Sequence, residues 1–531
     1  DRGFGHRDDP DQASISRAKC KGAKGDRILS PPALMVQGTG SEVGKSLLAA
    51  GLCRVFRNRH LNVRPFKPQN MSNNAAVTAD GGEIGRAQAL QARACGVETS
   101  VHMNPVLLKP QSEKGAQLIV QGQRVGNTDA RAFTEIKHSL LGKVVESFEI
   151  IGADAELVIV EGAGSPAEIN LRAGDIANMG FALAQDVPVV LVADIERGGV
   201  IANLIGTYEL LDENERKQVA GYIINKFRGD SSLFDDGVAE ITQRTGWSCL
   251  GILPYLATVN RLPAEDAVRL QENAFNPGNG RIKIAVPILS RIANFDDLDP
   301  LIAEPDVEVE FVKAGFPLPG DADFIILPGS KSTRADLDMI SEQEWNIDIA
   351  AHVRRGGWVL GLCGGYQMLG RTISDPNGVE GPAGTSEGLG YLDIQTILEP
   401  QKTHLRVKGT AIDGGAAIEG YEIHMGRTRG PDTTRPMLEV EKQPAGAVSA
   451  DGKVMGCYIH GLFNADEFRM QFLEKLSGRK CNGVAFERMV DETLDELARH
   501  LEAHLEIDRL WQLMDDWAIW GQRNNSNGRN S

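Results

Sequence analysis

One cysteine in the second half of the chain stands where a sharp turn could expose it as a nucleophile. Cys363 is the centre of GLCGG (361–365), which follows the apolar run WVL and precedes YQMLG, a predicted helix. This G-x-C-x-G pattern is the thiol counterpart of the strand–turn–helix elbow that presents a nucleophile above a sheet. Such a position favours the reactive thiolate over a buried, inert thiol. Cys457 lacks the flanking glycines and is expected in the core.

Groups that could assist this cysteine lie in the same half of the chain. The backbone N–H of Gly364 would form one half of an oxyanion hole, and the peptide that follows Gly329 in LPGS could supply the other half. CYIHG places His460 at the end of a strand-like run, which suits a general base. His424 in GYEIHMG is the alternative base. The pattern therefore predicts a Cys–His site for acyl transfer.

The first half of the chain carries a glycine-rich loop of the kind that binds nucleotide phosphates. GTGSEVGKS (38–46) follows the apolar run ALMVQ and leads into an apolar helix, with one residue more between its outer glycines than the standard motif has. Its backbone N–H groups and the helix N-terminus would face phosphates, Lys45 would reach the β- and γ-phosphates, and Ser46 would hold Mg²⁺. A loop that only caps a helix would not need GKS. The predicted nucleotide ligands on this loop are Gly38, Thr39, Gly40, Gly44, Lys45 and Ser46.

Acidic residues near this loop could complete a metal site. Glu161 ends the buried-strand candidate LVIV (157–160), and ligands of doubly wound sheets bind at such carboxyl ends. We therefore expect Glu161 to bind Mg²⁺, with a solvated loop acid as the alternative. Glu83 in DGGEIGRAQ could be a further metal ligand or a surface residue.

Polar residues in two further segments are candidates for substrate and base recognition. Lys67 in KPQNMSNN could contact an acidic substrate or the γ-phosphate, with Gln69 and Asn70 as further substrate residues, or the segment could be a surface loop. Asn225 and Lys226 in NKFRGD follow a strand and could recognise the nucleotide base. Asn and Lys are also common turn residues, so a plain turn is the alternative. His500 and His504 are spaced four apart on a predicted helix without a third ligand, which favours a solvated helix face over a metal site.

Short β-branched runs alternating with helical stretches predict an α/β protein with two doubly wound, mostly parallel sheets. The first domain is expected at 33–256 and the second at 281–480, with a Pro/Gly/Asn-rich linker at 257–280 between them. A helical segment is expected at 484–520, and disordered ends at 1–30 and 521–531.

Composition excludes several classes of function. The chain has 531 residues, 42% of them hydrophobic and 24% charged, which is enough for large cores. Its formal charge of −16 makes it a poor general binder of nucleic acid or of acidic membranes. No apolar run approaches the roughly 20 residues of a membrane span, and no secretory signal is recognised. Seven cysteines without a C-x-x-C pair fit a reducing cytoplasm.

Together the two halves resemble the glutamine-dependent amidoligases, and the motifs resemble most closely the cobyric acid synthases. The resemblance covers about 33–480 and is carried by QGTGSEVGKS, KPQNMSNN, DGGEIGRAQ, EGAGSPAEINL, DIANMG, NKFRGD, SRIANFDDLDPL, LPGSKST, GLCGGYQMLG, GYEIHMG and YIHGLF. The long phosphate loop is similar to that of dethiobiotin synthetase, and the second domain resembles a class I, triad-type glutamine amidotransferase. Triad enzymes usually carry His-x-Glu, whereas Gly461 and Leu462 follow His460. The third member is therefore not in its usual place and is left unassigned.

The resemblance implies ATP- and Mg²⁺-dependent amidation of four peripheral carboxylates (b, d, e and g) of adenosyl-cobyrinic acid a,c-diamide, giving cobyric acid in cobalamin biosynthesis. Each carboxylate would be activated as an acyl phosphate, and Cys363 and His460 would release ammonia from glutamine. The implied partners are the small molecules corrinoid, glutamine and ATP, in the cytoplasm, with no nucleic acid and no membrane; a homo-oligomer is left open.

Three alternatives remain. The first is the related cobyrinic acid a,c-diamide synthase, which a substrate test would separate. The second is a P-loop ATPase switch of the partition type, but positions 38–43 lack the early lysine of such switches, which also have no cysteine elbow. The third is an inactive binding module, against which the intact Lys45, Ser46, Cys363 and His460 argue.

Overall fold

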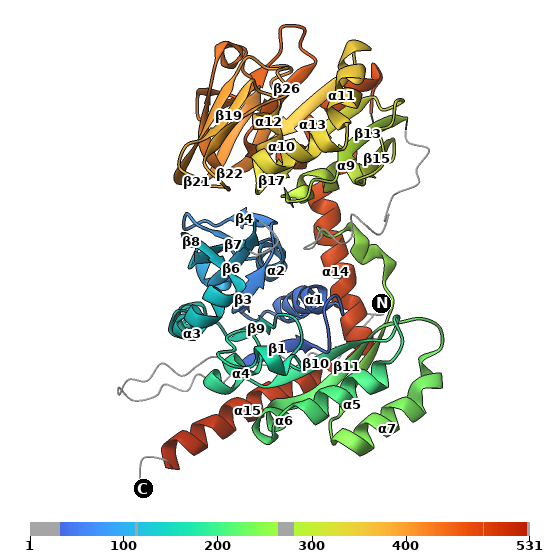
Figure 1. Cartoon of the computed structure of the whole chain (residues 1–531). Coiled ribbons are helices and arrows are strands. Elements are labelled where there is room, and N and C mark those ends of the chain that lie inside the picture. Colours follow the sequence, from blue (N-terminus) through green and yellow to red (C-terminus); the bar gives the residue numbers. More distant parts are fainter. Residues whose placement is uncertain (1–31, 112–114, 264–280, 482, 528–531) are drawn as a thin grey trace, which may run out of the picture.

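The strand that precedes the glycine-rich loop lies inside a parallel sheet. The computed structural model describes residues 32–111, 115–263, 281–481 and 483–527, and Figure 1 shows two units, one above the other. The lower, first unit has six parallel strands in the order β12-β11-β10-β1-β9-β2. Their bounds are β1 (Ala33–Gly38), β2 (Val63–Phe66), β9 (Leu157–Glu161), β10 (Val189–Asp194), β11 (Val219–Phe227) and β12 (Cys249–Pro254). Because β1 and β9 are neighbours, the loop after β1 and Glu161 meet at one edge of the sheet.

Helices cover both faces of this sheet, as buried parallel strands require. On one face, α1 (Lys45–Asn58), α2 (Arg86–Cys95) and the C-terminal α14 (Phe486–His504) share a core with Leu52, Phe56 and Leu497. The other core contains the mutually packed rings of Phe66, Phe148 and Phe181. The remaining helices of the first unit are α3 (Ala130–Gly152), α4 (Met179–Gln185), α5 (Val200–Leu210), α6 (Glu213–Gln218) and α7 (Asp235–Thr245).

Short strands that the sequence did not predict lie between the first sheet and the second unit. A four-stranded sheet has the order β3-β6-β7-β8, and β4 pairs with β5. The bounds are β3 (Gln69–Met71), β4 (Ala75–Val77), β5 (Glu83–Gly85), β6 (Val106–Pro110), β7 (Gly115–Val120) and β8 (Gln123–Asp129). Val77, Leu107 and Ile119 from these strands pack in one small core with Tyr421 and Ile423 of the second unit. The two units are therefore joined by an apolar contact.

The second unit is built on another mainly parallel sheet, in the order β15-β13-β16-β18-β26-β25, with only β25 antiparallel. Its strands are β13 (Ile282–Pro287), β15 (Val307–Val312), β16 (Phe324–Leu327), β18 (Trp358–Leu362), β25 (Ala447–Val448) and β26 (Val454–Cys457). Its helices are α9 (Asp299–Ile302), α10 (Thr333–Glu342), α11 (Trp345–Arg354), α12 (Gly364–Met368) and α13 (Asp466–Ser477). The predicted α/β class with mainly parallel central sheets is confirmed.

A second, largely antiparallel sheet of seven strands also belongs to this unit, and the sequence did not predict it. Its long strands β21 (Gln395–Ala411) and β22 (Ala417–Arg429) form a hairpin whose β22 edge pairs with β27 (Ile459–His460). The shorter strands are β19 (Thr372–Asp375), β20 (Gly384–Glu387), β23 (Leu438–Val440) and β24 (Gln443–Ala445). A separate pair, β14 (Ile292–Ala293) and β17 (Gly329–Ser330), lies beside the end of β16.

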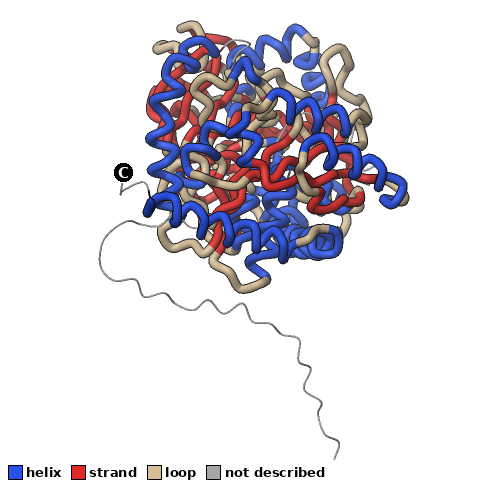
Figure 2. The backbone as a smooth tube through the Cα atoms, turned by 90° about the horizontal axis from the view of Figure 1, so that it is seen from below, coloured by secondary structure: helices blue, strands red, loops and turns tan. Residues whose placement is uncertain are grey.

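The predicted C-terminal helical segment forms two helices that return to the first unit. Leu494, Leu497 and Leu501 of α14 are buried against α1, and Arg54 of α1 forms an ion pair with Asp495. α15 (Ile507–Asn527) continues past the predicted end at residue 520. Seen from below, helices lie mostly around the outside of the strands (Figure 2). No helix among the described residues has the length and apolarity needed to cross a membrane. The expected tail at 1–30 and most of the expected linker lie outside the described residues.

Candidate active sites

Cys363 forms the turn between β18 and α12 that its flanking glycines predicted. Its backbone has φ +50° and ψ −105°, a conformation that non-glycine residues rarely adopt and that often marks functional sites. A Cβ on Gly361 would lie 2.5 Å from the Gly365 backbone, and a Cβ on Gly365 would lie 2.0 Å from the Leu327 oxygen. The elbow therefore requires glycine at positions 361 and 365. The residue with the strained backbone between them is Cys363, which carries the thiol.

His460 lies beside Cys363 and is oriented by an aspartate that the sequence did not identify. Its Nδ1 is 2.6 Å from Oδ2 of Asp297, whose Oδ1 accepts a hydrogen bond of 2.7 Å from the Gly461 N–H. Cys363 lines the same pocket and contributes to the pKa of His460, while its thiol donates a hydrogen bond of 3.8 Å to the Ile423 oxygen. Because Nδ1 faces the carboxylate, Nε2 is the nitrogen left for the thiol. The missing third group is thus an aspartate of SRIANFDDLDPL, a segment whose acids carried no assigned role.

Electrostatics favour a charged imidazole at this position. Burial alone would lower the pKa of His460, but the charge and hydrogen bond of Asp297, together with Cys363, raise it to about 10. A protonated imidazole beside a cysteine stabilises the thiolate, the form that attacks carbonyl carbon. The three side chains are therefore arranged for nucleophilic catalysis.

The ion pair between His460 and Asp297 should make the free energy of unfolding depend on pH. The pKa of His460 lies above its unfolded value of about 6.5, so the pair stabilises the fold fully below pH 6.5, and its contribution disappears as the pH rises towards 10. In urea unfolding, we expect the stability difference between wild type and His460→Gln to shrink by at least about 1.4 kcal/mol, the equivalent of one pKa unit, over that range. A difference independent of pH would contradict a protonated His460.

The two predicted halves of the oxyanion hole lie side by side. A Cβ on Gly364 would be 2.8 Å from the Ser330 nitrogen, and a Cβ on Gly329 would be 3.4 Å from Cε1 of His460. The peptide between Gly329 and Ser330 therefore adjoins both the elbow and the imidazole.

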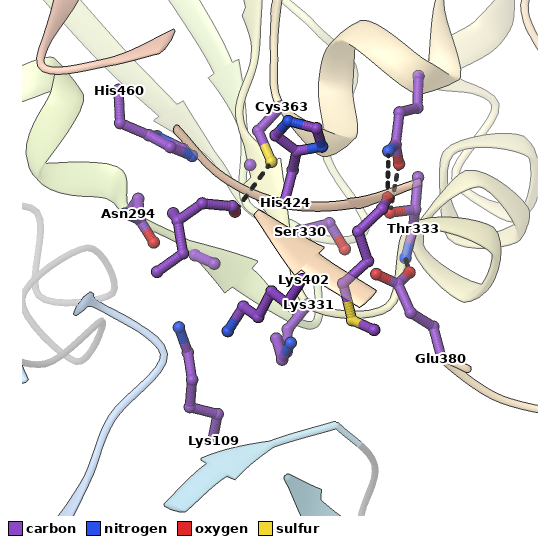
Figure 3. Close-up of a pocket in the computed structure, with 15 residues that line it drawn as sticks. Lys109, Asn294, Ser330, Lys331, Thr333, Cys363, Glu380, Lys402, His424 and His460 are labelled. Atoms are coloured by element: carbon purple, nitrogen blue, oxygen red, sulfur yellow. Dashed lines mark hydrogen bonds between the residues drawn. The ribbon is translucent and has the colours of Figure 1, made fainter. Parts of the chain in front are cut away.

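His424, the alternative base, has different surroundings. Its ring stacks on Tyr458 at 3.7 Å, and its Nε2 is 3.4 Å from Oε2 of Glu422. His424 lines the same pocket as Cys363 and His460 (Figure 3), but of these two histidines only His460 is hydrogen-bonded to an aspartate among the described residues. The geometry favours His460 as the base.

The glycine-rich loop places its lysine and serine at the end of the first sheet. The Lys45 ammonium donates hydrogen bonds of 2.8 Å to the Gly40 oxygen and 3.0 Å to the Gly164 oxygen. The Ser46 hydroxyl donates one of 2.7 Å to Oε1 of Glu161. Gly44 has φ +98°, a conformation that suits glycine and lets the loop turn into α1.

Glu161 is the centre of a buried polar cluster. Its carboxylate accepts hydrogen bonds from the Lys67 ammonium, at 2.8 Å, and from the Gln91 amide nitrogen, at 2.6 Å. The amide oxygen of Gln91 is buried without a hydrogen-bond partner among the described residues. Mg²⁺ prefers hydroxyl and carboxylate oxygens, so Ser46 and Glu161 are the residues that would hold a magnesium ion here.

Glu83 does not belong to this cluster. It is buried and forms ion pairs with Lys109, at 2.9 Å, and with Lys402, while its Oε1 lies 3.3 Å from Nε2 of His404. Burial raises the pKa of Glu83, but these cations hold it well below the usual range. These partners of Glu83 lie at the junction of the two units and include neither Ser46 nor Glu161, so the structure does not bring Glu83 to the predicted magnesium site.

The other substrate candidates are not surface residues. Lys67 is 5% exposed and Asn70 is 3% exposed, and Asn70 donates a hydrogen bond of 3.1 Å to Gln88 beside Glu161. The Gln69 side-chain oxygen is buried without a partner among the described residues. The surface-loop alternative is therefore wrong for Lys67 and Asn70, which are buried, whereas Met71 of the same segment is exposed.

Asn225 and Lys226 lie at a cavity of about 220 Å³ beside the phosphate loop. Asn225 donates a hydrogen bond of 2.8 Å to the Val43 oxygen, and the Lys226 ammonium contacts Asp194 at 2.8 Å. Helix α14 contributes His500 to the same cavity, and Nε2 of His500 is 2.9 Å from the Pro254 oxygen. His500 is thus half-buried, whereas His504 is exposed, so the predicted solvated face holds for His504 but not fully for His500.

Comparisons with known proteins agree with both halves of the chain. Residues 34–269 match the CobQ/CobB/MinD/ParA nucleotide binding domain, and residues 283–468 match the CobB/CobQ-like glutamine amidotransferase domain. A protein of Brucella anthropi named cobyric acid synthase is 60% identical over 91% of this chain and 99% of its own length. A protein of the same name from Rhodobacter capsulatus is 60% identical over 90% of this chain and 98% of its own length.

Proposed function

Because the chain belongs to the cobyric acid synthase family, we propose that it is a glutamine-hydrolysing, ATP-dependent amidoligase. Its substrate would be adenosyl-cobyrinic acid a,c-diamide, amidated at the b, d, e and g carboxylates to give cobyric acid in cobalamin biosynthesis. The observation that carries the proposal is the pairing, in one chain, of the Cys363–His460–Asp297 site with the Ser46–Glu161 site. The first suits release of ammonia from an amide, and the second suits activation of a carboxylate.

The first reaction would take place at Cys363. The thiolate attacks the side-chain amide carbon of glutamine, and the N–H groups of Gly364 and of the peptide after Gly329 stabilise the oxyanion. His460 transfers its Nε2 proton to the nitrogen, the C–N bond breaks and ammonia leaves. His460 then takes a proton from water, which hydrolyses the thioester to glutamate. Asp297 keeps the imidazole in the tautomer and orientation that both transfers need.

The second reaction would take place at the phosphate loop. A corrinoid carboxylate oxygen attacks the γ-phosphorus of ATP, ADP leaves, and an acyl phosphate forms. Ammonia then displaces phosphate and gives the amide. Lys45 and Lys67 would neutralise phosphate charge, and Ser46 and Glu161 would hold Mg²⁺, which when bound adds further neutralisation of the β- and γ-phosphates. Asn225 and Lys226 would contact the base. Because free ammonia is mostly protonated at neutral pH, we expect it to pass between the units without release.

The proposal is tested by incubating the protein with cobyrinic acid a,c-diamide, Mg-ATP and glutamine and counting the amides gained by mass spectrometry. Four amides are expected, with nearly one glutamate formed per amide. Cobyrinic acid is the parallel substrate: amidation of it at two positions, with none on the diamide, would favour the related a,c-diamide synthase. ATP hydrolysis without any amidation would contradict the proposal and favour the partition-type switch.

We propose that the protein works in the cytoplasm. The six cysteines in the part of the chain that the structure describes are free thiols, which supports a reducing compartment such as the cytoplasm. The proposed partners are the small molecules corrinoid, glutamine and ATP.

A further inference from the structure

Three lysines converge on the pocket that holds Cys363 (Figure 3). Lys109 comes from β6 of the first unit and Lys402 from β21 of the second, and both form ion pairs with Glu83. Lys331 follows β17 and differs from both. It is 6% exposed, it lines the pocket, and none of the described residues forms a hydrogen bond or an ion pair with its ammonium group.

A glutamate without a cationic partner among the described residues lines the same pocket. Glu380 accepts a hydrogen bond of 2.9 Å from the Thr333 N–H through Oε2. No lysine, arginine or histidine among the described residues lies within ion-pair distance of it. Burial raises the pKa of Glu380, and Lys331 opposes that rise. The pocket therefore presents a cation and an anion that attract each other without touching.

Such an arrangement is unfavourable unless a ligand completes it. Taking a charge out of water is unfavourable when no partner replaces the lost hydration. Burial and the nearby Lys109 lower the pKa of Lys331 to about 8, while Glu380 raises it. A ligand with a negative and a positive group on one carbon would relieve both residues at once.

The neighbouring residues hold this pair in place. Gln367, four residues after the nucleophile, donates hydrogen bonds to the Met425 oxygen and the Tyr458 hydroxyl at 3.1 and 3.2 Å. Its side-chain oxygen accepts one of 3.1 Å from the Thr333 hydroxyl, and the backbone of Thr333 in turn binds Glu380. The backbone N–H of Lys331 donates one of 2.9 Å to the Arg291 oxygen. The Glu380 carboxylate and the backbone of Lys331 are thus held relative to the elbow.

We infer that Lys331 binds the α-carboxylate of glutamine and that Glu380 binds its α-ammonium group, so that the side-chain amide points at Cys363. The inference rests on the proposed function, since it names the residues that would recognise its nitrogen donor. Lys331 directly follows Gly329 and Ser330, whose peptide adjoins the elbow. One short loop would therefore position both the carboxylate and the developing oxyanion.

The test combines charge-removing variants with substrates that lack one charge. Lys331→Met and Glu380→Gln are compared with wild type on glutamine, on glutaramate, which lacks the α-ammonium group, and on 4-aminobutanamide, which lacks the α-carboxylate. We expect Lys331→Met to raise the KM for glutamine and glutaramate about 30-fold or more and to leave 4-aminobutanamide unaffected. Glu380→Gln should raise the KM for glutamine and 4-aminobutanamide and leave glutaramate unaffected.

Controls separate recognition from folding. Lys408→Met removes an exposed lysine of β21, with 75% of its side chain accessible, and should leave every KM unchanged. Both pocket variants should keep wild-type amidation from ammonium salts. Equal increases in KM on all three substrates, or none on any, would overturn the inference. If wild type forms amides from ammonium but does not hydrolyse glutamine, the proposed glutaminase function fails instead, independently of Lys331 and Glu380.

Discussion

Replacing Cys363 by alanine should abolish glutamine-dependent amidation, with a loss of about 10⁴-fold or more, while amidation from ammonium salts continues at the wild-type rate. The thiol is the only group at the elbow that can form the thioester, and removal of a catalytic nucleophile has effects of this size. Ammonium at high concentration supplies ammonia without that step. The measurement is amide formation by mass spectrometry with each nitrogen source.

Cys457 offers the matched control. It is also buried, and its backbone oxygen accepts the hydrogen bond of the Cys363 N–H, but its side chain lies in the core of the second unit. Burial raises the pKa of Cys457 to about 12, so its thiol stays protonated and unreactive. Cys457→Ala should therefore keep glutamine-dependent activity. If Cys363→Ala lost activity with both glutamine and ammonium, or kept activity with both, the proposed division of work between the two units would be contradicted.

Local sequence patterns were enough to propose the nucleophile, its histidine and the phosphate loop. Cys363 and Ser46 each follow an apolar strand and a glycine turn, and such turns can be recognised within ten residues of sequence. Asp297 could not be found this way, because it lies 163 positions before His460 and is brought to it only by the fold. The same holds for Glu83, whose partner Lys402 is 319 positions away.

The fold was predictable where strands are buried on both faces. Runs such as LVIVE in β9 are buried throughout and stand out as continuous apolar segments. In contrast, only four of the 17 residues of β21 are buried, and its middle is exposed or half-buried, so its hairpin with β22 gave no such signal. That hairpin carries Lys402 into the pocket, and this explains why Lys402 was missed.

Replacing Asp297 by asparagine should lower the turnover of glutamine about 10²- to 10⁴-fold and leave ammonium-dependent amidation unchanged. Asparagine has nearly the same shape, but its amide carries no charge to stabilise the imidazolium and can favour the wrong tautomer of His460. Without Asp297, burial of the ring dominates, so the pKa of His460 should fall from about 10. The pH profile of glutamine hydrolysis should therefore lose activity at lower pH than it does in wild type.

The pH profile distinguishes an orienting role from a structural one. A variant that is merely less stable would lose activity with glutamine and with ammonium together, and its pH profile would keep the same shape. Asp321→Asn removes an exposed acid of the same unit that forms an ion pair with Lys283, and it should change neither turnover nor the pH profile. Glutamine turnover within tenfold of wild type in Asp297→Asn would mean that Cys363 and His460 act as a dyad. In that case Asp297 would serve mainly to fix the backbone through the Gly461 N–H.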